Sequence, residues 1–153
     1  AAQRILQAIP GLEFVDLQQP RVGYMCNTLQ PLPDYKREVH RELLQAASAA
    51  GVDTLAGVYH ACHRELCSHE RDWPFEVVNF LELLGESMGI HYEDHFKRLK
   101  KMQDVDAIFA DVAALADRYG MRPEEVKDVI RRDLIGEQPL ALRTVPVTSS
   151  TKE

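Results

Sequence analysis

Apolar and polar positions along the chain alternate in a way that predicts short helices and strands. Residues 1–9 carry apolar side chains at helical spacing, and Pro10-Gly11 end that helix. Residues 12–17 (Leu-Glu-Phe-Val-Asp-Leu) form a short run rich in strand formers, so we expect a buried strand there. Residues 20–33 include three prolines and one glycine and are predicted to form a loop. A loop of that length inside a compact domain is usually functional or disordered.

The following segments predict a βαβ-like unit. A helix is expected from Asp34, as its N-cap, to about Ala50, with Gly51 just past its end. Its apolar side is predicted to consist of Val39, Leu43, Leu44 and Ala47. Residues 52–59 then have the composition of a second strand. The order strand, loop, helix, strand favours a parallel sheet with a right-handed crossover, and such sheets bind ligands at the carboxyl ends of their strands.

The rest of the chain is predicted to be mainly helical. Residues 76–80 form a short candidate strand, and residues 81–88 a helix. Three further helices are expected over residues 92–102, 105–119 and 123–134, the last opened by a proline in its first turn. The predicted fold class is therefore α/β, with a small, mainly parallel sheet flanked by helices and an α-helical C-terminal extension.

These elements suggest three parts: an α/β domain over residues 1–90, a helical extension over 91–135 and an extended tail over 136–153. The first residues, Ala1-Ala2-Gln3, have no Met and lead almost at once into a strand pattern. We therefore expect that the start of the α/β domain is missing.

Composition narrows the function classes. The 153 residues include 18 basic and 24 acidic side chains, a net charge of −6, and this balance argues against a general nucleic-acid binder. No apolar run approaches the roughly 20 residues that span a bilayer, so no membrane span is predicted. Three cysteines are an odd number for a disulfide framework and indicate reduced thiols in a cytoplasmic protein.

The densest group of reactive side chains lies after the second predicted strand. Two thiols and three imidazoles fall within ten residues, in the order His60, Cys62, His63, Cys67 and His69. Thiolate and imidazole are ligands for zinc, copper and iron–sulfur clusters. Alternatively, the two cysteines are packed as small apolar residues while the histidines cap a helix. A third interpretation is a catalytic Cys62 thiolate activated by His60 or His63.

This region resembles the cysteine-rich CCG domain of heterodisulfide reductase B-type subunits and related iron–sulfur oxidoreductases. That family has one Cys, then Cys-Cys-Gly, and about 35 residues later Cys-x-x-Cys. Here 35 residues separate Cys26 from Cys62. The surrounding sequence is also similar to that of the family. It consists of Gly-Leu-Glu-Phe-Val-Asp-Leu before Cys26, Gly-Val-Tyr-His-Ala-Cys-His-Arg-Glu-Leu around Cys62, and Val-Val-Asn-Phe-Leu-Glu-Leu-Leu further on. The likeness covers about residues 3–90.

The chain departs from the family motif at several cysteines. Met25 stands where the pair has its first Cys, Asn27 replaces the Gly, and Glu65 replaces the last Cys of Cys-x-x-Cys. Only Cys26 and Cys62 match, two of five family ligands. The resemblance implies that these two would be the cluster ligands, supplemented by His60, His63 or Cys67.

By this resemblance the chain is a degenerate domain or subunit of a heterodisulfide reductase-like iron–sulfur oxidoreductase. It would act in electron transfer or thiol/disulfide redox chemistry, with an iron–sulfur cluster, zinc or no cofactor, beside a ferredoxin-like iron–sulfur protein in a complex. One alternative is an interaction subunit that kept the fold and lost the cluster. Another is a domain that zinc stabilises structurally.

Two features of the helical part are also candidates for binding. The basic run over residues 97–101 is most simply a solvated helix face, and otherwise a docking surface for an acidic electron-transfer partner. His91 and His95 lie four residues apart, at a spacing that puts both on one face of a helix.

Overall fold

Two short parallel strands form the centre of the structure. The computed structural model describes residues 2–19 and 26–136. Strand β1 (Thr54–Gly57) pairs in parallel with β2 (Glu76–Asn79), and Leu55 lies opposite Val77 in their register. The crossover between them consists of helix α3 (His60–Leu66) and the 3-10 helix η2 (Cys67–Arg71). The predicted α/β class, with a small parallel sheet and flanking helices, is confirmed.

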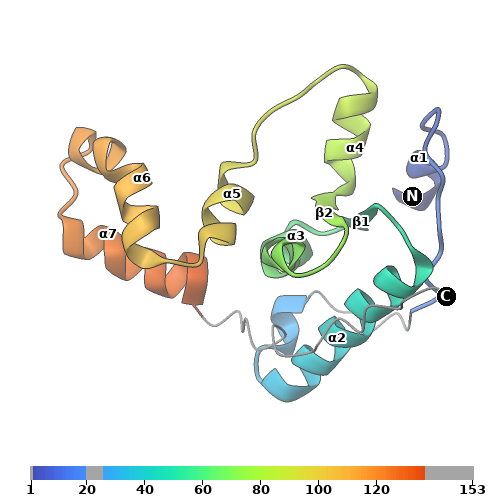
Figure 1. The fold of residues 1–153 in the computed structure, drawn as a ribbon, viewed down its shortest axis with the longest axis horizontal. Coiled ribbons are helices and arrows are strands. Elements are labelled where there is room, and N and C mark those ends of the chain that lie inside the picture. The colour runs from blue at the N-terminus through green and yellow to red at the C-terminus, as the bar shows by residue number, and fades with distance from the viewer. Residues whose placement is uncertain (1, 20–25, 137–153) are drawn as a thin grey trace, which may run out of the picture.

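Helices surround this sheet and extend away from it (Figure 1). Helix α5 (His95–Met102) lies between the sheet and helices α6 (Val105–Arg118) and α7 (Pro123–Val129), while α2 (Pro33–Ala50) lies below the sheet in this view. The remaining elements are α1 (Ala2–Leu6), the 3-10 helix η1 (Cys26–Leu29), α4 (Phe80–Ser87) and the π-helix η3 (Ile130–Gly136). The extended tail is predicted over residues 136–153; Gly136 instead ends η3, and residues 137–153 lie outside the described residues.

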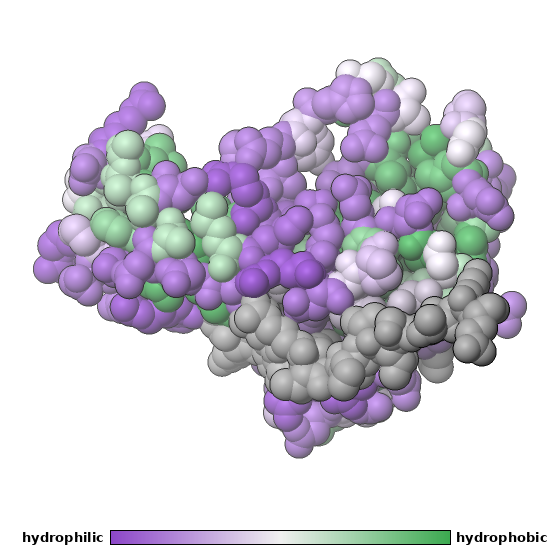
Figure 2. All heavy atoms as spheres, viewed as in Figure 1, coloured by the Kyte–Doolittle hydropathy of each residue, from purple (hydrophilic) through white to green (hydrophobic). Residues whose placement is uncertain are grey.

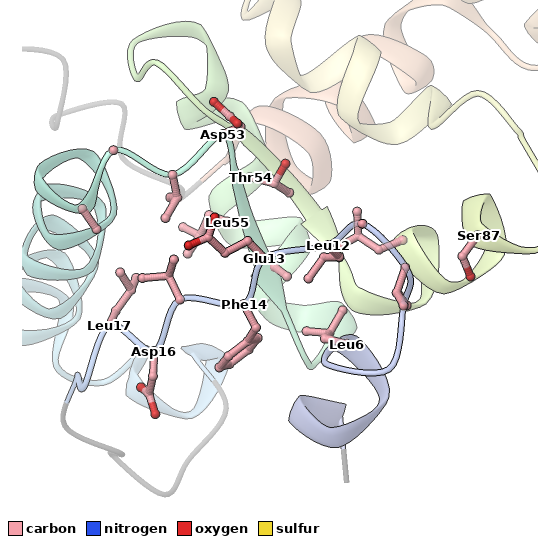
Figure 3. A pocket seen from close by; sticks show the side chains of 18 of the residues that line it. Leu6, Leu12, Glu13, Phe14, Asp16, Leu17, Asp53, Thr54, Leu55 and Ser87 are labelled. Atoms are coloured by element: carbon pink, nitrogen blue, oxygen red, sulfur yellow. The ribbon is translucent and has the colours of Figure 1, made fainter.

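The strand predicted over residues 12–17 is wrong. Residues 12–19 have no regular secondary structure, and the described part of the sheet has only β1 and β2. The segment runs beside β1 without joining its ladder (Figure 3). Several of its side chains are exposed, including Val15, so the apolar run does not have the burial that a central strand needs. The βαβ unit is therefore β1–α3–β2.

Helix α2 has the predicted length but a different start. Leu32 is its N-cap, and Pro33 occupies the first turn, where its missing N–H costs nothing. Asp34 lies within that turn and is not the cap. Gly51 ends the helix as expected, in the left-handed conformation with φ 65°.

The buried side of α2 is more polar than predicted. Its buried residues are Lys36, His40, Leu44 and Ala47, whereas Val39 and Leu43 are only half-buried. The Lys36 ammonium lies 2.6 Å from the carboxylate of Glu65 on α3, and both side chains are more than nine-tenths buried. This ion pair joins α2 to α3, so the polar residues of α2 pack against the crossover helix.

Most of the basic run of α5 binds groups of the crossover. Lys100 is fully buried, donates a hydrogen bond to the backbone carbonyl of Arg64 and lies 5.5 Å from the centre of the Phe96 ring. Burial lowers the pKa of Lys100 to about 8. Lys97 and Lys101 both bind the carboxylate of Glu70, at 3.2 and 2.9 Å. The interpretation of this run as a solvated face is wrong, because three of its four cations attach α5 to the crossover.

Apolar side chains form two clusters, and α5 contributes to both. The first lies between the sheet, α2 and the crossover, and Phe96 packs against it. The second lies among α6, α7 and η3, and Leu99 and Met102 pack against it. Figure 2 shows apolar surface at the α6 end and at the α1–α4 end, with hydrophilic residues between. The domain boundary predicted at residues 90/91 stays a prediction.

None of the helices in the described ranges combines the length and the apolar character needed to cross a membrane.

The buried histidine of α2 generates a prediction about pH. Burial, reinforced by the charges of Lys36 and Lys100, lowers the pKa of His40 from 6.5 to about 4. Between these values the unfolded chain binds a proton that the folded chain does not, so stability falls as the pH drops through this window. The full shift corresponds to about 3 kcal/mol. Chemical denaturation of H40Q between pH 7 and 4 should show a markedly shallower loss of stability than the unmodified chain.

The matched control is H91Q, because His91 is an exposed histidine. H91Q should retain the full pH dependence. Equal slopes for the unmodified chain and H40Q would contradict a neutral buried His40.

Candidate functional site

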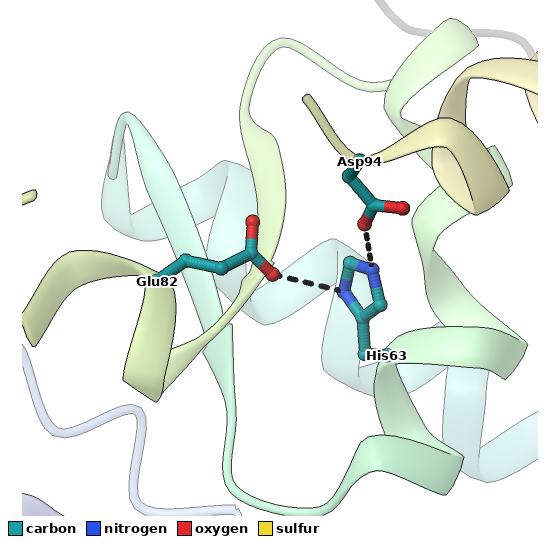
Figure 4. Close-up of side chains that lie close together, drawn as sticks. All are labelled: His63, Glu82 and Asp94. Carbon is teal, nitrogen blue, oxygen red and sulfur yellow. Dashed lines mark hydrogen bonds and ion pairs between the residues drawn. The ribbon is translucent and has the colours of Figure 1, made fainter. Parts of the chain in front are cut away.

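A buried histidine lies between two carboxylates from different helices (Figure 4). His63, on α3, is only 3% exposed. Its Nε2 atom lies 2.6 Å from Oδ2 of Asp94, and its Nδ1 atom lies 3.9 Å from Oε1 of Glu82. The two carboxylates are partly accessible, with side chains 18% and 17% exposed. The arrangement therefore joins α3, α4 and the start of α5 at one point.

Helix capping holds both carboxylates in position. Glu82 is the third residue of α4 and accepts a hydrogen bond from the Asn79 backbone N–H at 2.8 Å, completing a capping box. Asp94 is the N-cap of α5, and its Oδ1 atom accepts from the Lys97 backbone N–H at 2.9 Å. Each carboxylate thus uses one oxygen to begin a helix and also reaches His63.

The Asp94 contact fixes the orientation of the imidazole. Burial alone would raise the pKa of Asp94, but hydrogen bonds from the Lys97 backbone and from His63 offset this and hold its pKa below the usual range. An ionised Asp94 accepts a hydrogen bond, so Nε2 of His63 carries the proton. Nδ1 is buried and has no hydrogen-bond partner among the described residues. It faces the Glu82 carboxylate.

The structure distributes the sequence-predicted residues over different environments. His60 is exposed at the start of α3, Cys62 is half-buried, and His63 is buried against the two carboxylates. Cys67, the first residue of η2, is fully buried. These side chains therefore do not converge on one metal position within the described part of the chain, where the only group of three possible ligand atoms within 4.8 Å is His63, Glu82 and Asp94.

Cys67 lies in the environment of a packing residue. Its thiol is enclosed by the first apolar cluster, which includes Leu44, Leu66 and Val77. Burial raises its pKa from 9.0 to about 11, despite the opposing charge of Lys100. The thiol is protonated at neutral pH and offers no thiolate for a metal or a nucleophilic step.

The segments that carry Cys26 and Cys62 are in contact. Helix η1, which begins at Cys26, packs against α3. Cys62 lies just beyond the carboxyl end of β1, directly over Gly57: a Cβ atom on that glycine would lie 3.7 Å from Cβ of Cys62. The side chain of Cys26 lies outside the described residues. The fold therefore brings together two backbone segments that the sequence separates by 35 residues.

Sequence reasoning identified His63 but not its two partners. Glu82 and Asp94 carry helix-cap signals, Asn-x-x-Glu before α4 and an Asp before α5. Those signals locate helix starts but not the distance between them. His91 and His95, expected on one helix, are separated by the start of α5, because that helix begins only at His95.

The donors present do not fit a complete iron–sulfur cluster. The chain has three cysteines, and one of them, Cys67, is buried as a thiol in the apolar core. His63 binds Asp94 through Nε2, and its other nitrogen faces the carboxylate of Glu82, not a thiolate. At most two thiolates remain, whereas a cluster of the common type uses four.

A cavity of about 950 Å³ lies elsewhere, between the irregular N-terminal segment and the free edge of β1 (Figure 3). Apolar side chains line much of it, including Leu6, Leu12 and Leu55. Residues 12–17 form one of its walls, and it shares no lining residue with the His63 group.

Comparison of the chain with protein-family models, with curated proteins and with solved structures finds no match.

The environment of Cys67 predicts its reactivity. In the native protein, iodoacetamide should alkylate Cys62 well before Cys67, since only thiolates that reach solvent react. Peptide mapping by mass spectrometry would measure both rates, and urea should remove the difference. Native alkylation of Cys67 at the rate of Cys62 would contradict its placement in the core.

Proposed function

We propose that this chain is a CCG-like domain of a heterodisulfide reductase-like oxidoreductase, and that its chemistry is thiol/disulfide exchange through Cys62 and Cys26. The contact between η1 and α3 carries the proposal, because it joins the segments that hold these two cysteines. The position of Cys62 after a parallel strand, at the usual ligand-binding edge of such a sheet, also supports it. The buried Cys67 thiol takes no part.

The proposed reaction is a two-electron exchange with a disulfide substrate. The Cys62 thiolate attacks one substrate sulfur, the substrate S–S bond breaks, and a mixed disulfide and one substrate thiolate form. The Cys26 thiolate then attacks Cys62 and releases the second substrate thiolate. The two cysteines lose two electrons and two protons, which the substrate takes up as it becomes two thiols. An iron–sulfur partner subunit would return two electrons to the Cys26–Cys62 disulfide.

The test is a redox titration of the purified chain in glutathione buffers. After alkylation and peptide mapping, we expect a Cys26–Cys62 disulfide that forms and disappears in one two-electron step. C62S and C26S should each abolish that step, while C67S, the matched control, should retain it. A disulfide between these residues requires Cα atoms about 4.4–6.8 Å apart.

Failure of the two cysteines to form a disulfide at any glutathione ratio would contradict this function. So would stoichiometric iron and acid-labile sulfide in protein purified without oxygen, because the chain would then hold a cluster. Metal analysis and the titration together distinguish the two kinds of redox protein.

A second candidate is the interaction subunit without a cofactor, which one surface feature favours. Large apolar side chains are exposed along α4 and just after it: Leu81, Met88, Ile90 and Tyr92 are 53–68% exposed. A partner subunit of a redox complex would cover them. M88E should then weaken co-purification with that partner at least tenfold, while V129E, at an exposed apolar residue of α7, should not. Equal co-purification of both variants would exclude this surface.

A further inference from the structure

The His63 group has the donors of a metal site. We propose that His63 and Glu82 bind one divalent metal ion of the zinc class, with Asp94 orienting the imidazole from its other nitrogen. The proposed site uses neither Cys26 nor Cys62 as a ligand. Its ligands come from α3 and α4, and its orienting carboxylate comes from the start of α5.

With Nε2 of His63 bound to Asp94, the Nδ1 atom of the same ring faces the carboxylate of Glu82. Nε2–H donates to Asp94 at 2.6 Å, so in the neutral ring Nδ1 presents a lone pair. That atom is buried, unpartnered among the described residues and 3.9 Å from the carboxylate oxygen of Glu82. Two acceptors this close favour a cation between them.

The local charges leave room for that cation. Two carboxylates flank one imidazole. The charge of Lys97 acts on both carboxylates, but its ammonium lies 3.2 Å from Glu70 and donates to the backbone carbonyl of Val77 at 3.3 Å. Glu82 accepts a hydrogen bond from the Asn79 amide through Oε1, which fixes its carboxylate beside His63. The partial exposure of both carboxylates provides access for an ion and for the waters that would complete its coordination.

The spacing suits zinc. Zinc bonds to imidazole nitrogen and carboxylate oxygen are each about 2.1 Å long, so an ion can bridge 3.9 Å, and a tetrahedral angle needs the two side chains to approach by about 0.5 Å. The order carboxylate, histidine, metal is a common way to fix the tautomer of a metal ligand and raise its basicity. Here Asp94 supplies that carboxylate.

The experiment is a calorimetric titration of the full C26S/C62S chain with zinc, and its thermal unfolding is then measured with and without the metal. Removing both thiols separates this site from the proposed redox pair, so failure of either proposal leaves the other testable. We expect one Zn²⁺ per chain and a rise in Tm on binding. D94N should weaken zinc binding about 10- to 100-fold, as loss of an orienting partner does.

E82Q is the decisive variant, because a glutamine at this position can still complete the capping box of α4. It should weaken zinc binding at least tenfold with little change in Tm without metal. E86Q, an exposed glutamate on the same helix, is the matched control and should bind as the parent does. Absence of saturable binding, or equal zinc affinity in E82Q and the parent, would overturn the proposal. The positive charge between His63 and Glu82 would then be a proton and not a metal ion.

Discussion

The hydrogen bond between His63 and Asp94 is the contact on which the arrangement of this protein depends. Two parallel strands of four residues are too small to be stable alone, so the sheet needs helices on its faces. Helix α3 follows β1 directly, but α5 lies 31 residues further along the chain from His63 to Asp94. The contact brings the first turn of α5 onto α3, and the Lys97 and Lys101 contacts with Glu70 extend the attachment along the helix.

Polar groups take a large part in this core. Lys36, Glu65, His40 and Lys100 are buried with the apolar residues around α3. A buried ion pair is costly to desolvate, so its net contribution to stability is small, but removal of one partner leaves an uncompensated charge. Such groups are well suited to fix one arrangement of α2, α3 and α5, because a shifted helix would leave a charge unpaired.

The helices, strands and helix ends that could be predicted are those whose signal lies in neighbouring residues of the sequence. The strand at Glu76–Asn79, the end of α2 at Gly51 and the start of α7 at Pro123 all follow from neighbouring residues. Residues 12–17 have the same composition as a strand, yet pairing depends on a neighbour in space, which the sequence does not specify. The prediction that the run around Lys100 is solvated failed for the same reason: a lysine-rich run looks solvated until its partners are known, and Lys100 is buried.

The site residues also divide into those that the local sequence reveals and those that it does not. His63 stood out because it lies among other histidines and cysteines, whereas Glu82 and Asp94 looked like ordinary cap residues. The resemblance to the CCG family directed attention to Cys67 as a supplementary ligand, but its thiol belongs to the apolar core. Proximity in sequence therefore overstated how far these cysteines and histidines act together.

Helix α5 also determines how the molecule unfolds. Its Phe96 side belongs to the cluster around the sheet, and its Leu99 and Met102 side belongs to the cluster of α6, α7 and η3. Neither cluster can lose this helix and keep its own packing, so opening one exposes apolar surface of the other. The two clusters are consequently coupled through this eight-residue helix.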